Sequence, residues 1–326
     1  MRIFTSLLAM AALSVAAPAA AAKDPLKVQT AQAFKGVQDV VIGSFTVGFL
    51  MEKTDTARAG GGLLGGRGGG GRSTARQFLA GVTPAELQAI TDAAYADFKA
   101  QLAARGLAAA AGTDLLSSPA YAKVKPVAAP YEAAVAFGSD AKAKATYFAP
   151  TELRQLVLYP GDVMAGGLGA ISMNMAAGQA QMGAANYAKS AGKSVVNILY
   201  LIDFADADKY GGWFRSSSAV KVKAGLAVAP GSSRLTLFSP GGKVGSIALN
   251  DPVAIGGDFA EVSDTTSGGA KTAEAVANVI GFLGGVGTSK SRRYTFAAQP
   301  ELYSAAAVEA AKLTNARLVE RLVSLR

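Results

Sequence analysis

Residues 194–204 read Ser-Val-Val-Asn-Ile-Leu-Tyr-Leu-Ile-Asp-Phe and form the longest run of β-branched and aromatic apolar residues in the chain. Polar and apolar residues hardly alternate within this stretch. A strand with such a pattern is usually buried on both faces of a sheet. Ser194–Phe204 therefore predicts a strand in the middle of a sheet, and the rest of the fold is expected to build outward from it.

An acidic segment closed by two glycines follows the predicted strand and reads Asp-Phe-Ala-Asp-Ala-Asp-Lys-Tyr-Gly-Gly at 203–212. Aspartate side chains bond readily to nearby backbone amides and favour turns, and glycine adopts the backbone angles that turns need. We interpret the segment as a loop and as the best polar site for a ligand or partner. Its candidate contact residues are Asp203, Asp206, Asp208 and Tyr210.

The predicted fold class is α/β: a mixed sheet with an antiparallel meander, flanked by helices and followed by a long C-terminal helix. The apolar stretch Val40–Leu50 predicts a strand. Thr-Pro-Ala-Glu at 83–86 predicts a helix start, because the threonine can cap the helix, the proline suits its first position and the glutamate completes a capping box. Leu107–Ala111 is expected to be the next strand, which completes a β-α-β unit.

The second half of the chain predicts strands joined by short turns. Val220 to Val228 are apolar at every second position and alternate with Lys221 and Lys223, which is typical of a half-solvated antiparallel strand. Pro-Gly turns then separate Ser218–Val228, Arg234–Phe238 and Lys243–Leu249, which predict the meander. The other predicted strands are Ala145–Phe148, Phe259–Val262 and Arg293–Ala297. The other predicted helices are Asp114–Lys123, Met175–Lys189, Ala270–Leu283 and Pro300–Arg326, with a helical turn at Thr151–Leu158.

The N-terminus has the three parts of a secretory signal peptide. Arg2 is followed by the apolar stretch Ile3–Val15 and then by alanines up to Ala22, after which cleavage is expected. The apolar part is too short to span a bilayer as a mature helix. We therefore expect a periplasmic or secreted chain without a transmembrane span. Residues 23–326 predict one α/β domain, with a candidate boundary near residues 124–149.

The composition excludes several classes of chemistry, because the chain has no histidine and no cysteine. A Ser–His–Asp triad, a cysteine nucleophile, a zinc hydrolase and a haem held by His or Cys all need one of these residues. No cofactor is predicted. The net charge is +9, but the basic residues are dispersed, which argues against a nucleic-acid partner. A dispersed positive charge favours anionic envelope surfaces or only aids solubility.

Two glycine-rich tracts resemble phosphate-binding loops without matching them. Gly60–Arg72 lacks a Gly-Lys-Ser/Thr ending and predicts a flexible loop, in which Arg67 and Arg72 could contact an anion. Gly284–Ser291 has Ser289 in place of the glycine before the lysine, and it is expected to follow a helix instead of a strand. We interpret it as a turn that ends a helix.

Three chemical alternatives stay open. Asp206, Asp208 and Gly211 match three positions of a calcium loop, but Ser217 stands where the bidentate glutamate belongs. The pattern Ser-x-x-Lys occurs at 139–142 and 190–193, without the Lys-Thr-Gly of penicillin-recognising acyltransferases. Carboxylates far apart in the sequence could also meet in a cleft and hydrolyse a glycoside. A calcium-dependent binder and a periplasmic hydrolase using Asp/Glu or Ser–Lys chemistry are therefore the alternatives.

The order of the elements resembles two families of bacterial envelope proteins. Val40–Leu50, its capped helix, the helix-to-strand passage Tyr187–Phe204 and the meander resemble the periplasmic α/β domain of the curli-secretion-channel family and the N-terminal domain of TolB-type translocation proteins. Curli channel proteins carry a lipid anchor on a cysteine, which this chain lacks, so the resemblance implies a non-catalytic envelope role without a channel. We expect an exported, non-enzymatic binding or assembly protein whose partner is an envelope protein or surface.

Overall fold

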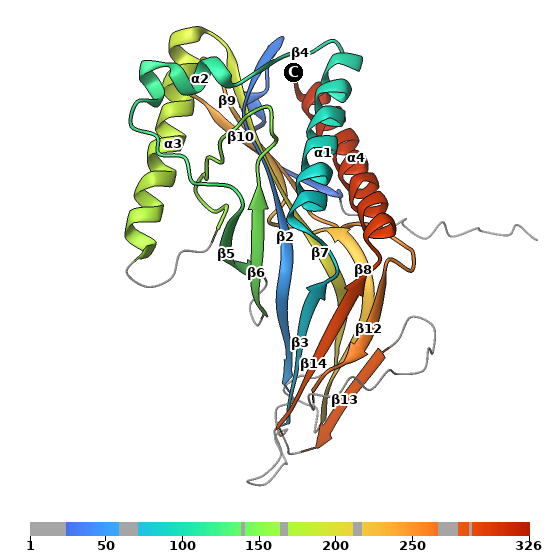
Figure 1. Cartoon of the computed structure of the whole chain (residues 1–326). Coiled ribbons are helices and arrows are strands. Elements are labelled where there is room, and N and C mark those ends of the chain that lie inside the picture. The colour runs from blue at the N-terminus through green and yellow to red at the C-terminus, as the bar shows by residue number, and fades with distance from the viewer. Residues whose placement is uncertain are drawn as a thin grey trace, which may run out of the picture.

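The computed structural model describes residues 24–58, 71–137, 141–163, 169–210, 217–266, 280–286 and 289–326. Within these ranges 14 strands form a single mixed sheet, with helices on both of its faces (Figure 1). This architecture confirms the predicted α/β fold class and the long C-terminal helix.

Two long parallel strands form the centre of the sheet. β2 (Asp39–Arg58) pairs with β7 (Ser194–Tyr210) in a register that runs from Val40 opposite Ser194 to Phe49 opposite Ile202. Every residue of β7 from Val195 to Ile202 is buried. The prediction of a strand buried on both faces in the middle of the sheet is therefore confirmed.

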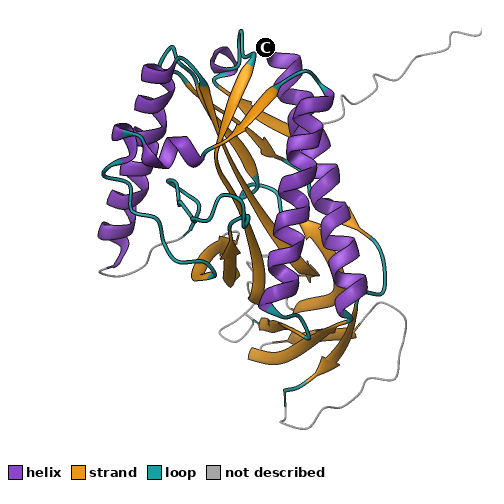
Figure 2. Ribbon diagram, turned by 45° about the horizontal axis from the view of Figure 1, so that its top comes forward, coloured by secondary structure: helices purple, strands orange, loops and turns teal. Residues whose placement is uncertain are grey.

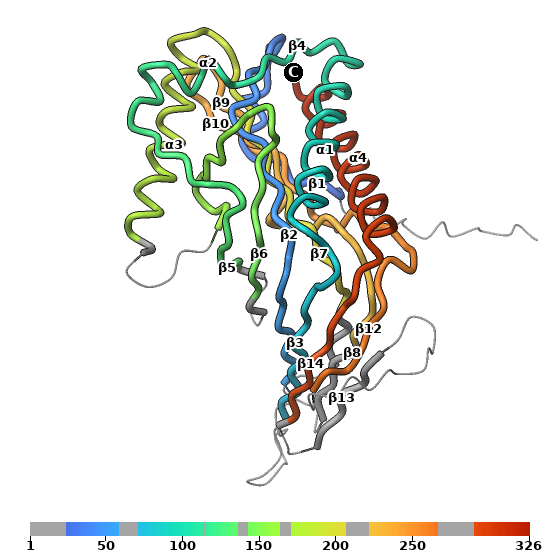
Figure 3. The backbone as a smooth tube through the Cα atoms, viewed as in Figure 1, coloured from blue at the N-terminus to red at the C-terminus, as the bar shows by residue number. Residues whose placement is uncertain are grey.

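The other strands extend the sheet on both sides of this pair. From one edge to the other the order is β1 (Leu26–Gln29), β10 (Val244–Leu249), β9 (Arg234–Phe238), β7, β2, β3 (Arg72–Ala80), β14 (Ser289–Ala298) and β12 (Ala260–Asp264). The remaining strands branch from this path and are β4 (Ala108–Ala111), β5 (Tyr131–Phe137), β6 (Ala141–Phe148), β8 (Ser217–Val228), β11 (Val253–Ile255) and β13 (Ile280–Val286). Figure 3 shows that β3 and β14, far apart in the sequence, run side by side.

The antiparallel region is arranged around β7. Because β7 has 17 residues, two strands pair with it end to end: β9 along its first half and β8 along its second half. β10 then pairs with β9 as a hairpin. β8 and β9 are therefore consecutive in the chain but each pairs with β7, and they do not form a hairpin with each other.

The helices divide between the two faces of the sheet (Figure 2). α1 (Pro84–Ala104) and α4 (Pro300–Leu325) pack against each other and cover the larger core. α3 (Gly169–Ala191) lies on the other face with the short helices α2 (Thr113–Ser117) and η2 (Pro119–Tyr121), over Val41 and Val195. A further single turn, η1 (Ala31–Ala33), precedes β2.

β7 and β3 extend into segments that the sequence predicted as loop or left unassigned, and β1, β5 and β11 also lie in unassigned segments. β7 continues to Tyr210, so the interpretation of residues 203–210 as a loop is wrong; Gly211 and Gly212 lie outside the described residues. Arg72, expected at the end of a flexible loop, is the first residue of β3. Of the rest of the predicted loop, Gly71 is described and residues 60–70 lie outside the described residues.

Two helix predictions are also wrong. Residues 280–283 of the predicted helix Ala270–Leu283 belong to β13, and residues 270–279 lie outside the described part. The tract Gly284–Ser291 therefore does not end a helix: residues 284–286 are the end of β13 and residues 289–291 are the start of β14. Thr151–Leu158 is a turn followed by extended chain, in which Leu156 bridges to Val127. Glycines at 281, 284, 285 and 287 make a helix costly in the first segment, and Pro150 and Pro160 flank the second.

The start of α1 agrees with the prediction in detail. The Thr83 hydroxyl accepts a hydrogen bond from the Glu86 amide at 3.3 Å, and the Glu86 carboxylate accepts one from the Thr83 amide at 2.6 Å. Replacing Thr83 with alanine should lower the free energy of unfolding by about 1 kcal/mol, because the Glu86 amide at the helix start loses its acceptor. Urea denaturation measures this, and Thr83→Ser, which keeps the hydroxyl, should stay close to wild type.

Candidate functional site

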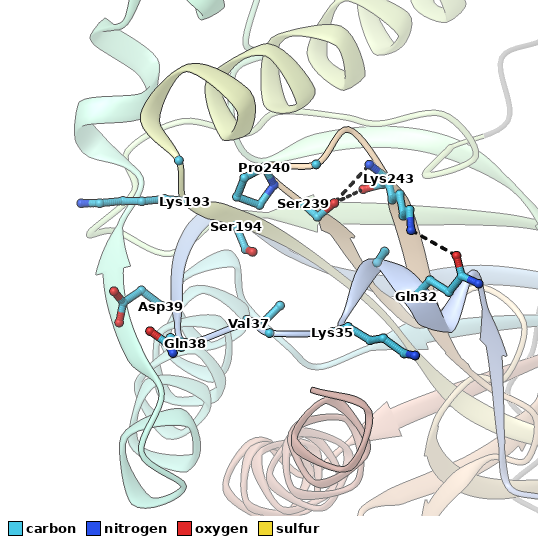
Figure 4. Close-up of a pocket in the computed structure, with 14 residues that line it drawn as sticks. Gln32, Lys35, Val37, Gln38, Asp39, Lys193, Ser194, Ser239, Pro240 and Lys243 are labelled. Carbon is cyan, nitrogen blue, oxygen red and sulfur yellow. Dashed lines mark hydrogen bonds between the residues drawn. The ribbon is translucent and has the colours of Figure 1, made fainter.

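A pocket of about 620 Å³ lies at one end of the central strands (Figure 4). Three segments far apart in the sequence line it: residues 32–39 before β2, residues 192–194 between α3 and β7, and residues 239–243 between β9 and β10. The pocket is open, because most of its lining residues are exposed.

The topology explains why these segments meet. β7 is parallel to β2, and β10 is antiparallel to β9, which is itself antiparallel to β7. β2, β7 and β10 therefore run in the same direction and all begin at the same end of the sheet. A lysine beside a glycine precedes each of these strands: Lys35-Gly36 before β2, Gly192-Lys193 before β7 and Gly242-Lys243 before β10.

Positive charge dominates the pocket. Lys35, Lys193 and Lys243 line it, against a single carboxylate, Asp39. Figure 4 shows Lys193 and Asp39 on one side of the pocket and Lys243 with Gln32 on the other. Within the described residues none of the three lysines forms an ion pair with a carboxylate. Like charges around one concave surface attract an anion.

The turn between β9 and β10 holds one side of the pocket in place. The Ser239 hydroxyl accepts from the Lys243 amide and donates to the Lys243 carbonyl, both at 3.1 Å. The Lys243 ammonium donates to the Gln32 side-chain oxygen at 3.1 Å. This turn and η1 are therefore tied together, and the Lys243 charge has a defined position.

The pocket does not assemble a nucleophile. The Ser239 hydroxyl is used within its own turn, and within the described residues no serine hydroxyl of the pocket bonds to a lysine ammonium. Of the pattern Ser-x-x-Lys at 190–193, only Lys193 lines the pocket; Ser190 donates to the Tyr187 carbonyl. Ser139 of the other copy lies outside the described residues. No cluster of acidic residues in the described ranges has the arrangement of a metal site.

Asp203, the first of the predicted contact residues, lies inside the protein. Its side chain accepts a hydrogen bond from the Lys53 ammonium at 2.7 Å, and Lys53 also donates to the Ala205 carbonyl at 2.7 Å. Asp55 lies 3.8 Å from the same ammonium and accepts from the Gln77 amide at 2.8 Å. We call Lys53, Asp55, Asp203 and Gln77 the Lys53 cluster. Burial raises the pKa of Asp203, and the Lys53 ammonium opposes that rise.

Asp206 points the other way. Three residues beyond Asp203 on β7, it is exposed and pairs with Lys223 of β8 at 2.9 Å. The side chains of Asp208 and Tyr210 lie outside the described part of the structure. The structure thus does not bring Asp203 and Asp206 together: one is an interior partner of Lys53 and the other lies on the sheet surface.

A second acid with a raised pKa also lies away from the pocket. Asp162 accepts from the Arg234 guanidinium at 2.5 Å and from the Tyr159 amide at 2.7 Å. Burial raises the pKa of Asp162 to about 6, while Arg234 and the Tyr159 amide lower it. Tyr147 donates to the Asp162 carbonyl at 3.2 Å. Asp162 lines neither described pocket, so we assign it to the folding of the 159–163 turn.

A further pocket of about 540 Å³ lies beside the C-terminal half of α4. Its charges balance, because Arg317 and Arg321 stand against Asp251 and Glu320. Arg321 is already paired with Asp24 at 2.7 Å. This surface offers no excess of either charge to a ligand, in contrast to the pocket of Lys35, Lys193 and Lys243.

The pocket was not predicted from the sequence, although a signal exists. A glycine beside a lysine precedes each of β2, β7 and β10. Only the pairing of these strands with one another and with β9 reveals that the three begin at the same end of the sheet. What the pocket binds must be argued from its own residues, because comparisons with protein-family models, curated proteins and solved structures find no match.

Proposed function

We propose that the protein is an exported, non-enzymatic binding or assembly protein of the cell envelope, and that it holds an anionic group in the pocket of Lys35, Lys193 and Lys243. The observation that carries the proposal is the charge of this pocket. Three lysines from three separate segments surround it and one carboxylate opposes them. Phosphate and carboxylate groups are the common anions that lysine ammonium groups bind.

The non-enzymatic part of the proposal rests on the composition and on the pocket. The chain has no histidine or cysteine, and the pocket serines make no hydrogen bond with a lysine ammonium in the described residues. A serine nucleophile needs such a base within about 2.6–3.2 Å. A fluorescent penicillin that labelled Ser190 or Ser194 would overturn this part.

The envelope part rests on the N-terminus and on the element order. Arg2, the apolar stretch Ile3–Val15 and the alanines before Lys23 have the layout of an export signal. The resemblance to the curli-secretion-channel and TolB-type domains supports a role in envelope assembly. The excess of basic residues suits a compartment bounded by anionic lipids and polymers.

Removal of the three lysines tests the pocket. Calorimetric titration of residues 23–326 with inorganic pyrophosphate at low ionic strength should show binding that weakens as salt is added. Lys35→Gln/Lys193→Gln/Lys243→Gln should lower the affinity at least tenfold, equivalent to about 1.4 kcal/mol. The exposed lysines of the pocket do not pack in the core, so the variant should fold like wild type.

The matched control removes the same charge elsewhere. Lys27→Gln/Lys290→Gln/Lys312→Gln changes three exposed lysines on β1, β14 and α4 and leaves the pocket intact. It should bind pyrophosphate like wild type. Equal weakening in both triple variants would mean that only net charge matters, and wild type that fails to bind would refute the anion site.

A further inference from the structure

We propose that the outward side of α3 binds the surface of a membrane that contains anionic lipids. This side carries Ile171, Met175 and Met182, with Lys189 on the same line, and we call these four residues the α3 outer face. The inference goes beyond the proposed function, because it uses none of the pocket residues and stands if the pocket binds nothing.

The apolar residues of the α3 outer face are unusually exposed. Ile171, Met175 and Met182 are 67%, 62% and 60% exposed, more than any other large apolar side chain in the described residues. Their spacing of 4 and then 7 residues places them on one side of the helix, since each residue turns by about 100°. Single exposed apolar residues are ordinary, but several on one helix face mark an interaction surface.

The opposite side of α3 shows that the exposed apolar residues are not needed to pack the helix on the sheet. The buried side chains described on α3 are all alanines, namely Ala177, Ala180, Ala184 and Ala188, and the last three pack on the sheet. An ordinary surface helix buries its large apolar residues and exposes its polar ones. α3 turns Ile171, Met175 and Met182 away from the protein, although its other large apolar residues, Met173 and Tyr187, are half-buried. Figures 1 and 2 show the helix at the outer edge of the molecule.

Charge complementarity identifies the partner surface. α3 contains no aspartate or glutamate, and Lys189 is its one charged residue. Lys123 and Lys125 lie beside the helix, because they flank Val124, whose side chain is close to Gly183 of α3. Within the described residues none of these three lysines is in an ion pair. Each lysine near an anionic bilayer adds to binding.

A membrane surface fits Lys189 better than a second copy of the chain does. Lys189 follows Met182 by seven residues and lies on the apolar line. In a helix pair it would be buried opposite apolar residues with no acid on either α3 to pair with. At a bilayer its stem lies along the apolar region while the ammonium reaches the phosphates. Interfacial helices insert apolar side chains at the boundary of headgroups and acyl chains. No helix in the described ranges has the length and apolar content to cross the membrane itself.

Vesicle flotation of residues 23–326 tests the proposal. Wild type should float with vesicles of phosphatidylglycerol and phosphatidylethanolamine and much less with vesicles of phosphatidylcholine. Ile171→Gln/Met175→Gln/Met182→Gln should bind the anionic vesicles at least tenfold more weakly. Lys123→Gln/Lys125→Gln/Lys189→Gln should lose the preference for anionic lipid. Wild type that stays in solution with both kinds of vesicle refutes the proposal.

Two controls separate this surface from others. Leu302→Gln/Leu313→Gln removes the exposed apolar residues of α4 and should float like wild type. The pocket variant Lys35→Gln/Lys193→Gln/Lys243→Gln should also float like wild type, so the two proposals fail independently. An apolar α3 variant that floats normally, or that only loses self-association in sedimentation, would assign the surface to no partner or to a second copy and overturn the proposal.

A labelled variant reports the contact directly. Because the chain has no cysteine, Met175→Cys carries one environment-sensitive fluorophore at a known site. Its emission should shift to shorter wavelength on anionic vesicles, whereas Leu302→Cys should show no shift. A shift at both positions, or at Leu302→Cys alone, contradicts docking through the α3 outer face.

Discussion

A Lys53→Met variant is expected to unfold with a free energy about 3–5 kcal/mol lower than that of wild type. Lys53 is 3% exposed, and its ammonium bonds to Asp203 and to the Ala205 carbonyl, both at 2.7 Å. Methionine fills a similar volume but leaves the buried carboxylates of Asp203 and Asp55 without their shared cation. Removal of one partner of a buried ion pair is costly because the remaining charge cannot be solvated. Urea denaturation followed by circular dichroism measures the loss.

β7 itself supplies the control for this prediction. Asp206 lies three residues from Asp203 and pairs with Lys223, but the two side chains are 53% and 40% exposed. Exposed ion pairs contribute about 0–1 kcal/mol. Asp206→Asn should therefore change the free energy of unfolding by less than about 1 kcal/mol, whereas Asp203→Asn should cost several times more.

A double variant distinguishes lost charge pairing from lost packing. If Lys53→Met acts by leaving a carboxylate unpaired, then Lys53→Met/Asp203→Asn should be less destabilised than the two single variants together. We expect a coupling of at least about 2 kcal/mol, within the range for residues in one network. Strictly additive losses would contradict a buried ion pair and would reduce the Lys53 cluster to ordinary packing.

The sequence predicted the elements whose apolar pattern agrees with their burial. The apolar run of β7 and the capping box of α1 are local signals, and both are where they were expected. β3 shows why others were missed. Its buried face carries Ser73 and Gln77, while Phe78 is only half-buried. Because Gln77 is held inside by Asp55 of another strand, hydropathy along β3 does not reveal which side faces the core.

The acidic end of β7 was misread for a related reason. Aspartates at 203, 206 and 208 indicated a solvated loop, but Ala205 is buried and Asp206 exposed, as in a strand with one solvated face. Asp203 is interior, where its carboxylate pairs with Lys53 of β2. The lysine pocket has the same origin, since the pairing of distant strands brings its segments together. Long-range pairing, which no local pattern encodes, thus determined both the site and the main errors.

The stability of the wild-type protein should rise as the pH falls toward 4, through Asp162. Burial raises the pKa of Asp162 from 3.8 to about 6, against the opposing effects of Arg234 and the Tyr159 amide. Between about pH 4 and pH 6 the folded state therefore holds a proton that the unfolded chain has lost. The free energy of unfolding decreases as the pH rises through this window, by about 3 kcal/mol from this group, and the loss is complete above about pH 6.

An Asp162→Asn variant isolates this contribution, because asparagine does not titrate and other groups change equally in both proteins. The difference in free energy of unfolding between wild type and Asp162→Asn should shift by about 3 kcal/mol between pH 4 and pH 7, with wild type relatively more stable at pH 4. Urea denaturation at several pH values measures this. Arg234→Gln removes the cation 2.5 Å from the carboxylate and should extend the window above pH 6. A difference that stays constant with pH would mean that the pKa of Asp162 is the same in the folded and unfolded states, so that the Arg234 pair and the Tyr159 amide offset burial.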